Sequence, residues 1–306
     1  MPAVERIISA DGRAAMPPGL PGIDSIRQQR AHENFPVALR ALPPGVRDDL
    51  VAIYGFARLV DDVGDRYDGD RLAALDWLEA DLDHAVRGTA VHPLVGALTP
   101  VIRAHQVDVG LCRDLIEANR RDQHQNRYGS FDDLLGYCRL SANPVGRLVL
   151  AVFDSTTPSN EALSDDVCTA LQIVEHLQDV GEDARDGRIY LPLDDLATSG
   201  CDPDDVLAAT ASPPLRHVVS VEATRAASLL SSGPTLVRQL HGWARLAVAG
   251  FVAGGLATVD AIRDADHDVL GHGCRPSKRR VAMHAARLLT NSVRAPRHGS
   301  RSRTAA

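Results

Sequence analysis

The sequence predicts an all-α protein built as one helical domain. Helical patterns of about 10–20 residues recur along the chain, whereas strand signals are scarce. Hydrophobic residues make up 44% of the 306 residues and aromatic residues only 4%, so we expect a core of Leu, Val and Ala between close-packed helices. Residues 1–24, rich in Pro, Gly and Ala, are expected to form a flexible leader, and residues 25–275 the helical domain.

Helix boundaries are visible in the first half of the chain. Residues 43–45, Pro-Pro-Gly, precede an apolar run that predicts a helix over 46–66. Asp70 is a typical N-cap for a helix over 69–88. Three more helices are expected over 25–42, 92–105 and 111–126.

The next predicted helix has a marked start and a break. Ser130 and Asp133 form the S-x-x-D pattern of a capping box. Pro144, within the segment SANPVG at 141–146, lacks a backbone N–H and therefore predicts a kink. Farther on, Leu246–Val259 is an apolar run of about 14 residues with three glycines, which predicts a buried helix because it is too short to span a bilayer.

The chain shows no feature of a secreted protein. Its N-terminus lacks a basic segment followed by an uninterrupted apolar core, so we expect no signal peptide. The five cysteines show no C-x-x-C spacing, which favours reduced thiols over a disulfide framework or a zinc site. A cytoplasmic location is therefore expected.

Acidic residues share one face of a helix predicted within the stretch Ala170–Leu193. Glu175, Asp179 and Asp183 fall at i, i+4 and i+8, so their side chains stack along one stripe. Like charges at this spacing destabilise a helix slightly. Such a stripe is either a solvated face or the binding site of a cation.

A second acidic pattern favours the cation. Asp61 and Asp65 are four residues apart, Asp62 lies beside them, and all three follow the apolar run Leu50–Val60. Carboxylate oxygens are the ligands that Mg²⁺ prefers, and Mg²⁺ commonly joins a few carboxylates to substrate phosphates. Two facing Asp-rich helices would hold a magnesium diphosphate.

These residues resemble the squalene/phytoene synthase family of head-to-head prenyl synthases. The first pattern matches the family's DDxxD motif, and the second, DVGED followed by GRIYLP, matches its second motif. Matching segments cover roughly residues 30–265, and Asn34 and Phe35 match a pair in the family's first helix. The resemblance implies an isoprenoid-synthase helical bundle around a central diphosphate and prenyl cavity.

The resemblance also implies site residues, a metal and a substrate. Prenyl diphosphate is the expected substrate and Mg²⁺, or Mn²⁺ in its place, the expected cofactor. Arg58 and Arg188 are expected to donate to phosphate oxygens, and Tyr137 to offer its ring to a carbocation; a salt bridge with the same aspartates is the alternative for the arginines. The expected metal ligands are Asp61, Asp62, Asp65, Asp179, Glu182 and Asp183; the expected substrate-binding residues are Tyr54, Arg58, Tyr137, Gln172, Glu175, Arg188 and Tyr190.

The segment SANPVG resembles the hopanoid-pathway branch, which converts presqualene diphosphate to hydroxysqualene. We expect Asn143 to place a water near the carbocation, which makes it a candidate catalytic residue and requires no NADPH. Functional coupling to other hopanoid-pathway enzymes would follow. The alternatives are a squalene or phytoene synthase that condenses two farnesyl or geranylgeranyl diphosphates, and a non-catalytic helical partner protein.

Two positions depart from the family pattern. Glu175 stands where relatives usually carry Asn, and Gln178 where they often carry Arg. A carboxylate at position 175 either binds metal or weakens the binding of an anionic diphosphate.

Charge is distributed unevenly along the chain. All 40 acidic residues lie at or before Asp268, whereas residues 276–306 carry only basic charge. We expect these residues to form a basic C-terminal tail, in which an apolar stripe contacts an anionic membrane surface. The stripe consists of Val281, Ala285, Leu288 and Leu289. A disordered polar tail is the alternative, and the acidic body argues against nucleic-acid binding.

Overall fold

The computed structural model describes residues 14–23, 42–271 and 274–291, and within these ranges it contains helices and no strand. This confirms the all-α prediction. The helix predicted over 25–42, with Asn34 and Phe35, lies outside the described residues. The helices are α3 Pro44–Arg66, α4 Arg71–Arg87, α5 Pro93–Gly96, α6 Leu98–His105, α7 Val109–Asp122, α8 Phe131–Ser141, α9 Asn143–Val152, α10 Pro158–Arg185, α11 Leu193–Thr198, α12 Pro213–Leu230, α13 Gly233–Gln239, α14 Gly242–Asp264 and α15 Lys278–Asn291, with a 3₁₀ turn at Pro203–Leu207.

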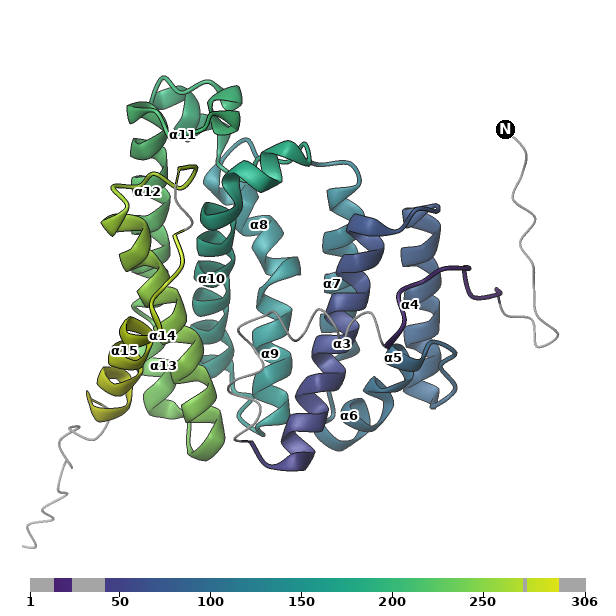
Figure 1. The fold of residues 1–306 in the computed structure, drawn as a ribbon. Helices are drawn as coiled ribbons and strands as arrows, with labels where there is room; N and C mark the ends of the chain where they lie inside the picture. Colours follow the sequence, from purple (N-terminus) through teal and green to yellow (C-terminus); the bar gives the residue numbers. More distant parts are fainter. Residues whose placement is uncertain (1–13, 24–41, 272–273, 292–306) are drawn as a thin grey trace, which may run out of the picture.

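Two apolar cores lie side by side in the bundle (Figure 1). One is formed mainly by α3 to α7 and the other mainly by α8 and α10 to α15. Helix α9 belongs to both, since Leu148 and Val152 pack in the first core and Leu150 in the second. A helix with apolar residues on two faces can only be buried between two layers, and α9 therefore joins the two halves.

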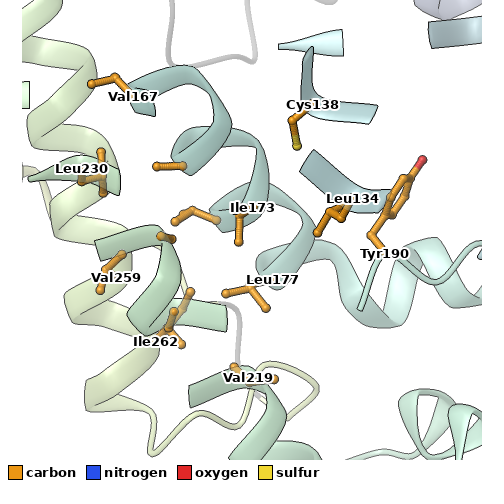
Figure 2. Packing of buried hydrophobic residues seen from close by; sticks show 14 of the residues in the cluster. Leu134, Cys138, Val167, Ile173, Leu177, Tyr190, Val219, Leu230, Val259 and Ile262 are labelled. Carbon is orange, nitrogen blue, oxygen red and sulfur yellow. The ribbon is translucent and has the colours of Figure 1, made fainter. Parts of the chain in front are cut away.

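Helix α10 is the central element of the second core (Figure 2). Its buried stripe includes Val167, Ile173 and Leu177, which are between 1% and 3% exposed. Leu134 and Cys138 of α8 lie on one side of this stripe, and side chains of α12 and α14 lie on the other. Because one face of α10 is fixed by packing, its acidic face is turned away from the core.

Local signals in the sequence set several boundaries. The Asp70 side chain accepts a hydrogen bond from Ala73 N at 3.0 Å and begins α4, as predicted. Ser130 and Asp133 form the predicted capping box of α8. The chain breaks at Ala142, so the predicted kink is a separation into α8 and α9. The helix predicted over 92–105 is divided into α5 and α6.

The two ends of the described chain are packed against the bundle. Ala14 O accepts a hydrogen bond from Trp77 Nε1 of α4 at 3.0 Å, within the leader expected to be flexible. At the other end α15 packs on α14, and Leu288 is 8% exposed. The expected tail therefore begins with a packed helix, whose apolar stripe of Val281, Ala285, Leu288 and Leu289 contacts the core.

Helix α14 is long and apolar enough to cross a membrane by length and composition alone, since it extends beyond the apolar run seen in the sequence. Of its most apolar stretch, 56% is buried inside the protein. A core helix of a globular domain passes the same test, and α14 packs on α10, α12, α13 and α15.

Candidate active site

Two loops that follow α7 and α10 pair with each other and define one end of the bundle. Arg127 and Ile189 form an isolated parallel bridge, in which Ile189 N donates to Asn126 O at 3.0 Å. Leu193 N donates to Tyr128 O at 2.9 Å. The segment GRIYLP is therefore fixed beside the end of α7, and Arg188 and Tyr190 are held next to the acidic motifs.

On α3 the three aspartates have different surroundings. Asp61 and Asp65 are exposed, whereas Asp62 is 4% exposed. Asp62 Oδ1 lies 3.3 Å from Arg58 Nε and 3.9 Å from Arg66 Nη1. Arg58 therefore forms a salt bridge with an aspartate, which the sequence analysis gave as the alternative to phosphate binding. The assignment of Asp62 as a metal ligand stays a prediction. A metal ion would have to compete with these two arginines for the Asp62 carboxylate.

On α10 the acidic stripe is open to solvent. Glu175, Asp179 and Glu182 are exposed, and Asp183 is half-buried. Desolvation raises the pKa of Asp179, the charges of Asp183 and Glu182 raise it further, and the charge of Arg275 lowers it. The stripe therefore carries excess negative charge.

Arg188 joins the two motifs. Its Nη2 lies 2.7 Å from Asp65 Oδ1 of α3, although Arg188 itself follows α10 by three residues. Its pKa is raised because the nearby charges of Asp65 and Asp122 outweigh the desolvation of the guanidinium. The sequence predicted that the motifs face each other, and this ion pair brings their ends together.

The electrostatics fit a divalent cation. Asp61 is open to solvent on one side, yet the surrounding helices desolvate its carboxyl and raise its pKa from 3.8 to about 6; Asp65 and Asp62 raise it, and Asn119 lowers it. Among the described residues no group of three or more metal-binding side chains converges at one point. The carboxylates are instead divided between two helices, which suits Mg²⁺, an ion that takes one or two carboxylates and completes its shell with water and phosphate oxygens.

Aromatic rings gather below the motifs. Tyr137 of α8 is 7% exposed, and its ring centroid is 5.6 Å from that of Tyr190 and 5.5 Å from that of Tyr128. His176 of α10 stacks on Tyr190 with centroids 3.6 Å apart, and its Nδ1 lies 3.7 Å from Asp183 Oδ2. Burial lowers the pKa of His176, so the ring is neutral at physiological pH.

The remaining predicted residues fall into two groups. Tyr54 lies one turn before the predicted Arg58 on α3. Gln172 Nε2 lies 3.2 Å from Nε2 of His176, the ring that stacks on the predicted Tyr190. Gln178 instead donates from Nε2 to Cys274 O at 2.8 Å and ties α10 to the segment before α15, which gives this departure a structural role.

Asn143 is not brought to the aspartates. Its Oδ1 accepts a hydrogen bond from Thr169 Oγ1 at 2.9 Å, and both residues line a cavity of about 520 Å³ with Arg139, Arg147 and Asp165. No residue of either acidic motif lines this cavity. Thr169 precedes Asp179 by ten residues, which corresponds to about 15 Å along α10. The catalytic role of Asn143 stays a prediction.

The sequence analysis missed three residues of this site. Asn119 Nδ2 donates to Asp61 Oδ1 at 3.1 Å, and Tyr137 Oη donates to Asp122 Oδ2 at 2.8 Å. The three missed residues are therefore Asn119, Asp122 and His176. A signal for the first two existed, because the buried stripe of α7 that includes Cys112 and Leu115 becomes polar at Asn119, where a helix facing only an apolar core would stay apolar.

Comparison with known proteins agrees with this geometry. The squalene/phytoene synthase family matches residues 28–287. Hydroxysqualene synthases from Zymomonas mobilis and Rhodopseudomonas palustris are each 38% identical, over 68% and 71% of this chain and 71% and 75% of their own. Phytoene synthase 1 from Arabidopsis thaliana is 32% identical over 70% of this chain and 52% of its own.

Solved structures share the fold. The crystal structure of squalene synthase HpnC from Alicyclobacillus acidocaldarius has a TM-score of 0.75 and 38% identity, covering 80% of this chain and 94% of that one. A dehydrosqualene synthase has a TM-score of 0.78 at 21% identity, which supports the fold alone. The family match spans most of the chain and includes both acidic motifs. The chain therefore belongs to the squalene/phytoene synthase family, whose enzymes act on prenyl diphosphates.

Proposed function

We propose that the enzyme converts presqualene diphosphate and water to hydroxysqualene and diphosphate. The bond between carbon and the diphosphate oxygen breaks, the water oxygen bonds to the rearranged carbocation, and the water loses one proton. The similarity to two hydroxysqualene synthases at 38% identity supports this choice over phytoene synthesis, for which the identity is 32%.

The observation that carries the proposal is the ion pair of Arg188 with Asp65. It holds the last turn of α3 beside the segment after α10, so that the carboxylates of both motifs lie at one end of the bundle. A diphosphate bound there meets acidic groups on two sides. Such an arrangement binds an anion only when cations lie between.

Asp61 and Asp65 of α3 and Asp179 and Asp183 of α10 would hold Mg²⁺, with Glu182 beside them; Mn²⁺ fits the same oxygen ligands. When bound, the ion neutralises the charge that develops on the departing diphosphate. Arg188 donates to phosphate oxygens with its planar fork, and Arg58 does so when it leaves Asp62. Tyr190 and Gln172 add polar contacts near these groups.

The carbocation must be surrounded by side chains that do not react with it as nucleophiles. Tyr137 supplies an aromatic face, and the apolar side chains of the core exclude bulk water. Quenching by water needs no reductant, so no NADPH is expected. Asn143, which is 6% exposed and fixed by Thr169, is proposed to influence how water reaches the cation.

A second candidate function is squalene synthesis from two farnesyl diphosphates. It is favoured by one observation, the likeness at 38% identity to a structure described as a squalene synthase. The two candidates differ in substrate and in the need for a hydride donor.

The deciding experiment supplies the purified protein and Mg²⁺ with presqualene diphosphate or farnesyl diphosphate in ¹⁸O-labelled water, with and without NADPH. We expect labelled hydroxysqualene from presqualene diphosphate in both conditions. Formation of squalene only with NADPH would instead assign the second candidate. In the same assay, Asn143→Gly is expected to shift products from the alcohol toward elimination.

A further inference from the structure

The last turn of α7 contacts the first acidic motif closely. Gln123 Nε2 donates to Gly64 O at 2.9 Å, and Asn119 Nδ2 donates to Asp61 Oδ1 at 3.1 Å. A Cβ at position 64 would lie 2.1 Å from Asn119 Oδ1, so only glycine allows α7 this near to α3. The turn that carries Asp122 is therefore held rigidly beside the site.

Asp122 connects this turn to Tyr137. Its Oδ2 accepts the hydrogen bond from the Tyr137 hydroxyl at 2.8 Å, and its Oδ1 is buried without a hydrogen-bond partner among the described residues. Burial raises the pKa of Asp122 to about 6, whereas the hydrogen bond from Tyr137 and the charge of Arg188 lower it. The carboxylate is thus mostly ionised at pH 7 or above, at a cost in stability.

The hydrogen bond constrains the phenol of Tyr137. The rings of Tyr128 and Tyr190 fix the ring plane, and donation to Asp122 fixes the hydroxyl hydrogen. A phenol that donates to a carboxylate has a more electron-rich ring and cannot donate the same hydrogen elsewhere. An electron-rich ring attracts a cation more strongly, and a negative charge held at the ring's hydroxyl adds to that attraction without offering a nucleophile at the ring.

We infer that Asp122 is a positioning residue that, through Tyr137, stabilises the carbocation formed when diphosphate leaves, an inference that rests on the proposed function. Asp122 acts by its charge and by holding the phenol, and it makes no contact with the substrate. Simple support of the fold is the competing explanation. The two explanations predict different effects for a substitution that removes the charge of Asp122 but keeps the shape of its side chain.

The test compares Asp122→Asn, Tyr137→Phe and the double variant with wild type. Asparagine keeps an acceptor for the hydroxyl, so we expect an unchanged or higher melting temperature. We expect kcat to fall by about tenfold or more with KM within about twofold, because the lost interaction strengthens only as the cation forms. Since Asp122 acts through Tyr137, the double variant should be no less active than the less active of the two single variants.

The matched control is Glu117→Gln, on the same helix and half-buried, which is expected to keep wild-type kcat. A second readout needs no substrate. The near-ultraviolet spectrum of Asp122→Asn should differ from that of wild type through the weakened phenol hydrogen bond, and this difference should vanish in the Tyr137→Phe background.

A kcat of Asp122→Asn within twofold of wild type, losses that multiply in the double variant, or an unchanged spectrum would each overturn the inference. Turnover is measured as diphosphate release from whichever prenyl diphosphate wild type consumes. If the wild type consumes farnesyl diphosphate alone, the proposed function is contradicted. The inference about Asp122 is still tested, because its variants are compared with wild type on that same substrate.

Discussion

Arg188 and Asp65 form an ion pair, with Nη2 and Oδ1 2.7 Å apart, that joins the segment after α10 to the last turn of α3. The two side chains are 21% and 43% exposed, so the pair contributes only about 0–1 kcal/mol to the free energy of unfolding. Its value is geometric, because it places a guanidinium between the two acidic motifs.

We expect Arg188→Lys to raise KM for the prenyl diphosphate by about tenfold or more, since lysine keeps the charge but loses the bidentate fork. Melting temperature should change little for the reason just given. Steady-state diphosphate release measures KM, and Arg113→Lys, in a surface pair with Asp83 at 2.6 Å, is the matched control. An unchanged KM would show that Arg188 pairs with Asp65 and does not bind substrate.

Turnover should require a divalent cation. Asp179→Asn is expected to lower kcat by about 10²-fold or more while leaving the helical circular dichroism spectrum intact, because charge on the leaving group is then poorly neutralised. Chelation with EDTA should abolish diphosphate release, and added Mg²⁺ should restore it. Full activity in EDTA contradicts the metal assignment.

Asp61 should make stability depend on pH. Its pKa is raised from 3.8 to about 6 by folding, so the folded protein binds this proton more tightly than the unfolded chain does. Its contribution favours folding below about pH 4 and is lost as the pH rises through 6. Without metal, Asp61→Asn should therefore melt about 2 °C above wild type at pH 8, a shift that corresponds to roughly 1 kcal/mol in a domain of this size.

At pH 4 the melting temperatures of Asp61→Asn and wild type should converge, because the wild-type carboxyl is then largely protonated. The exposed Asp68 provides the control variant Asp68→Asn, which should show no such pH-dependent difference. A variant less stable than wild type at pH 8 would mean that the charge of Asp61 is compensated in the folded state.

Glu175→Asn tests the extra carboxylate on the acidic stripe. Glu175 is exposed one turn before Asp179, so its charge acts on the same bound anion. If the charge is merely tolerated, the variant keeps or improves substrate affinity, by up to a few fold in KM. A loss of activity comparable to that of Asp179→Asn would identify Glu175 as a metal ligand.

The basic C-terminal region should bind anionic vesicles by charge. The outward face of α15 carries Arg279 and Arg287 beside the exposed Met283, whereas its apolar stripe is packed on α14. We expect Arg279→Glu with Arg287→Glu to weaken binding to vesicles that contain phosphatidylglycerol, and high salt to have the same effect on wild type.

The control for vesicle binding is Arg87→Glu with Arg103→Glu, the same change of charge on α4 and α6. Equal binding by both double variants and wild type would assign the membrane no role. Deletion of residues 276–306 is a poor test, because it removes the packing of α15 on α14 and should lower the melting temperature.

The sequence by itself determined the helices and the chemistry of the two acidic motifs. Helix positions follow from apolar spacing and capping residues such as Asp70 and Ser130, which act within one or two turns of the chain. The stacking of Asp179 on Asp183 likewise follows from helix geometry alone. These features are local, and the family resemblance depended on them.

Only the tertiary structure decided which side chains from different helices meet. The pairing of Arg188 with Asp65 and the contact of Asp122 with Tyr137 join segments that are distant in sequence, and their partners depend on how the helices pack. The same holds for α15, whose apolar stripe fits a membrane or a neighbouring helix equally well in sequence. In the structure the stripe packs against α14, and this contact buries Leu288 within the protein's own core.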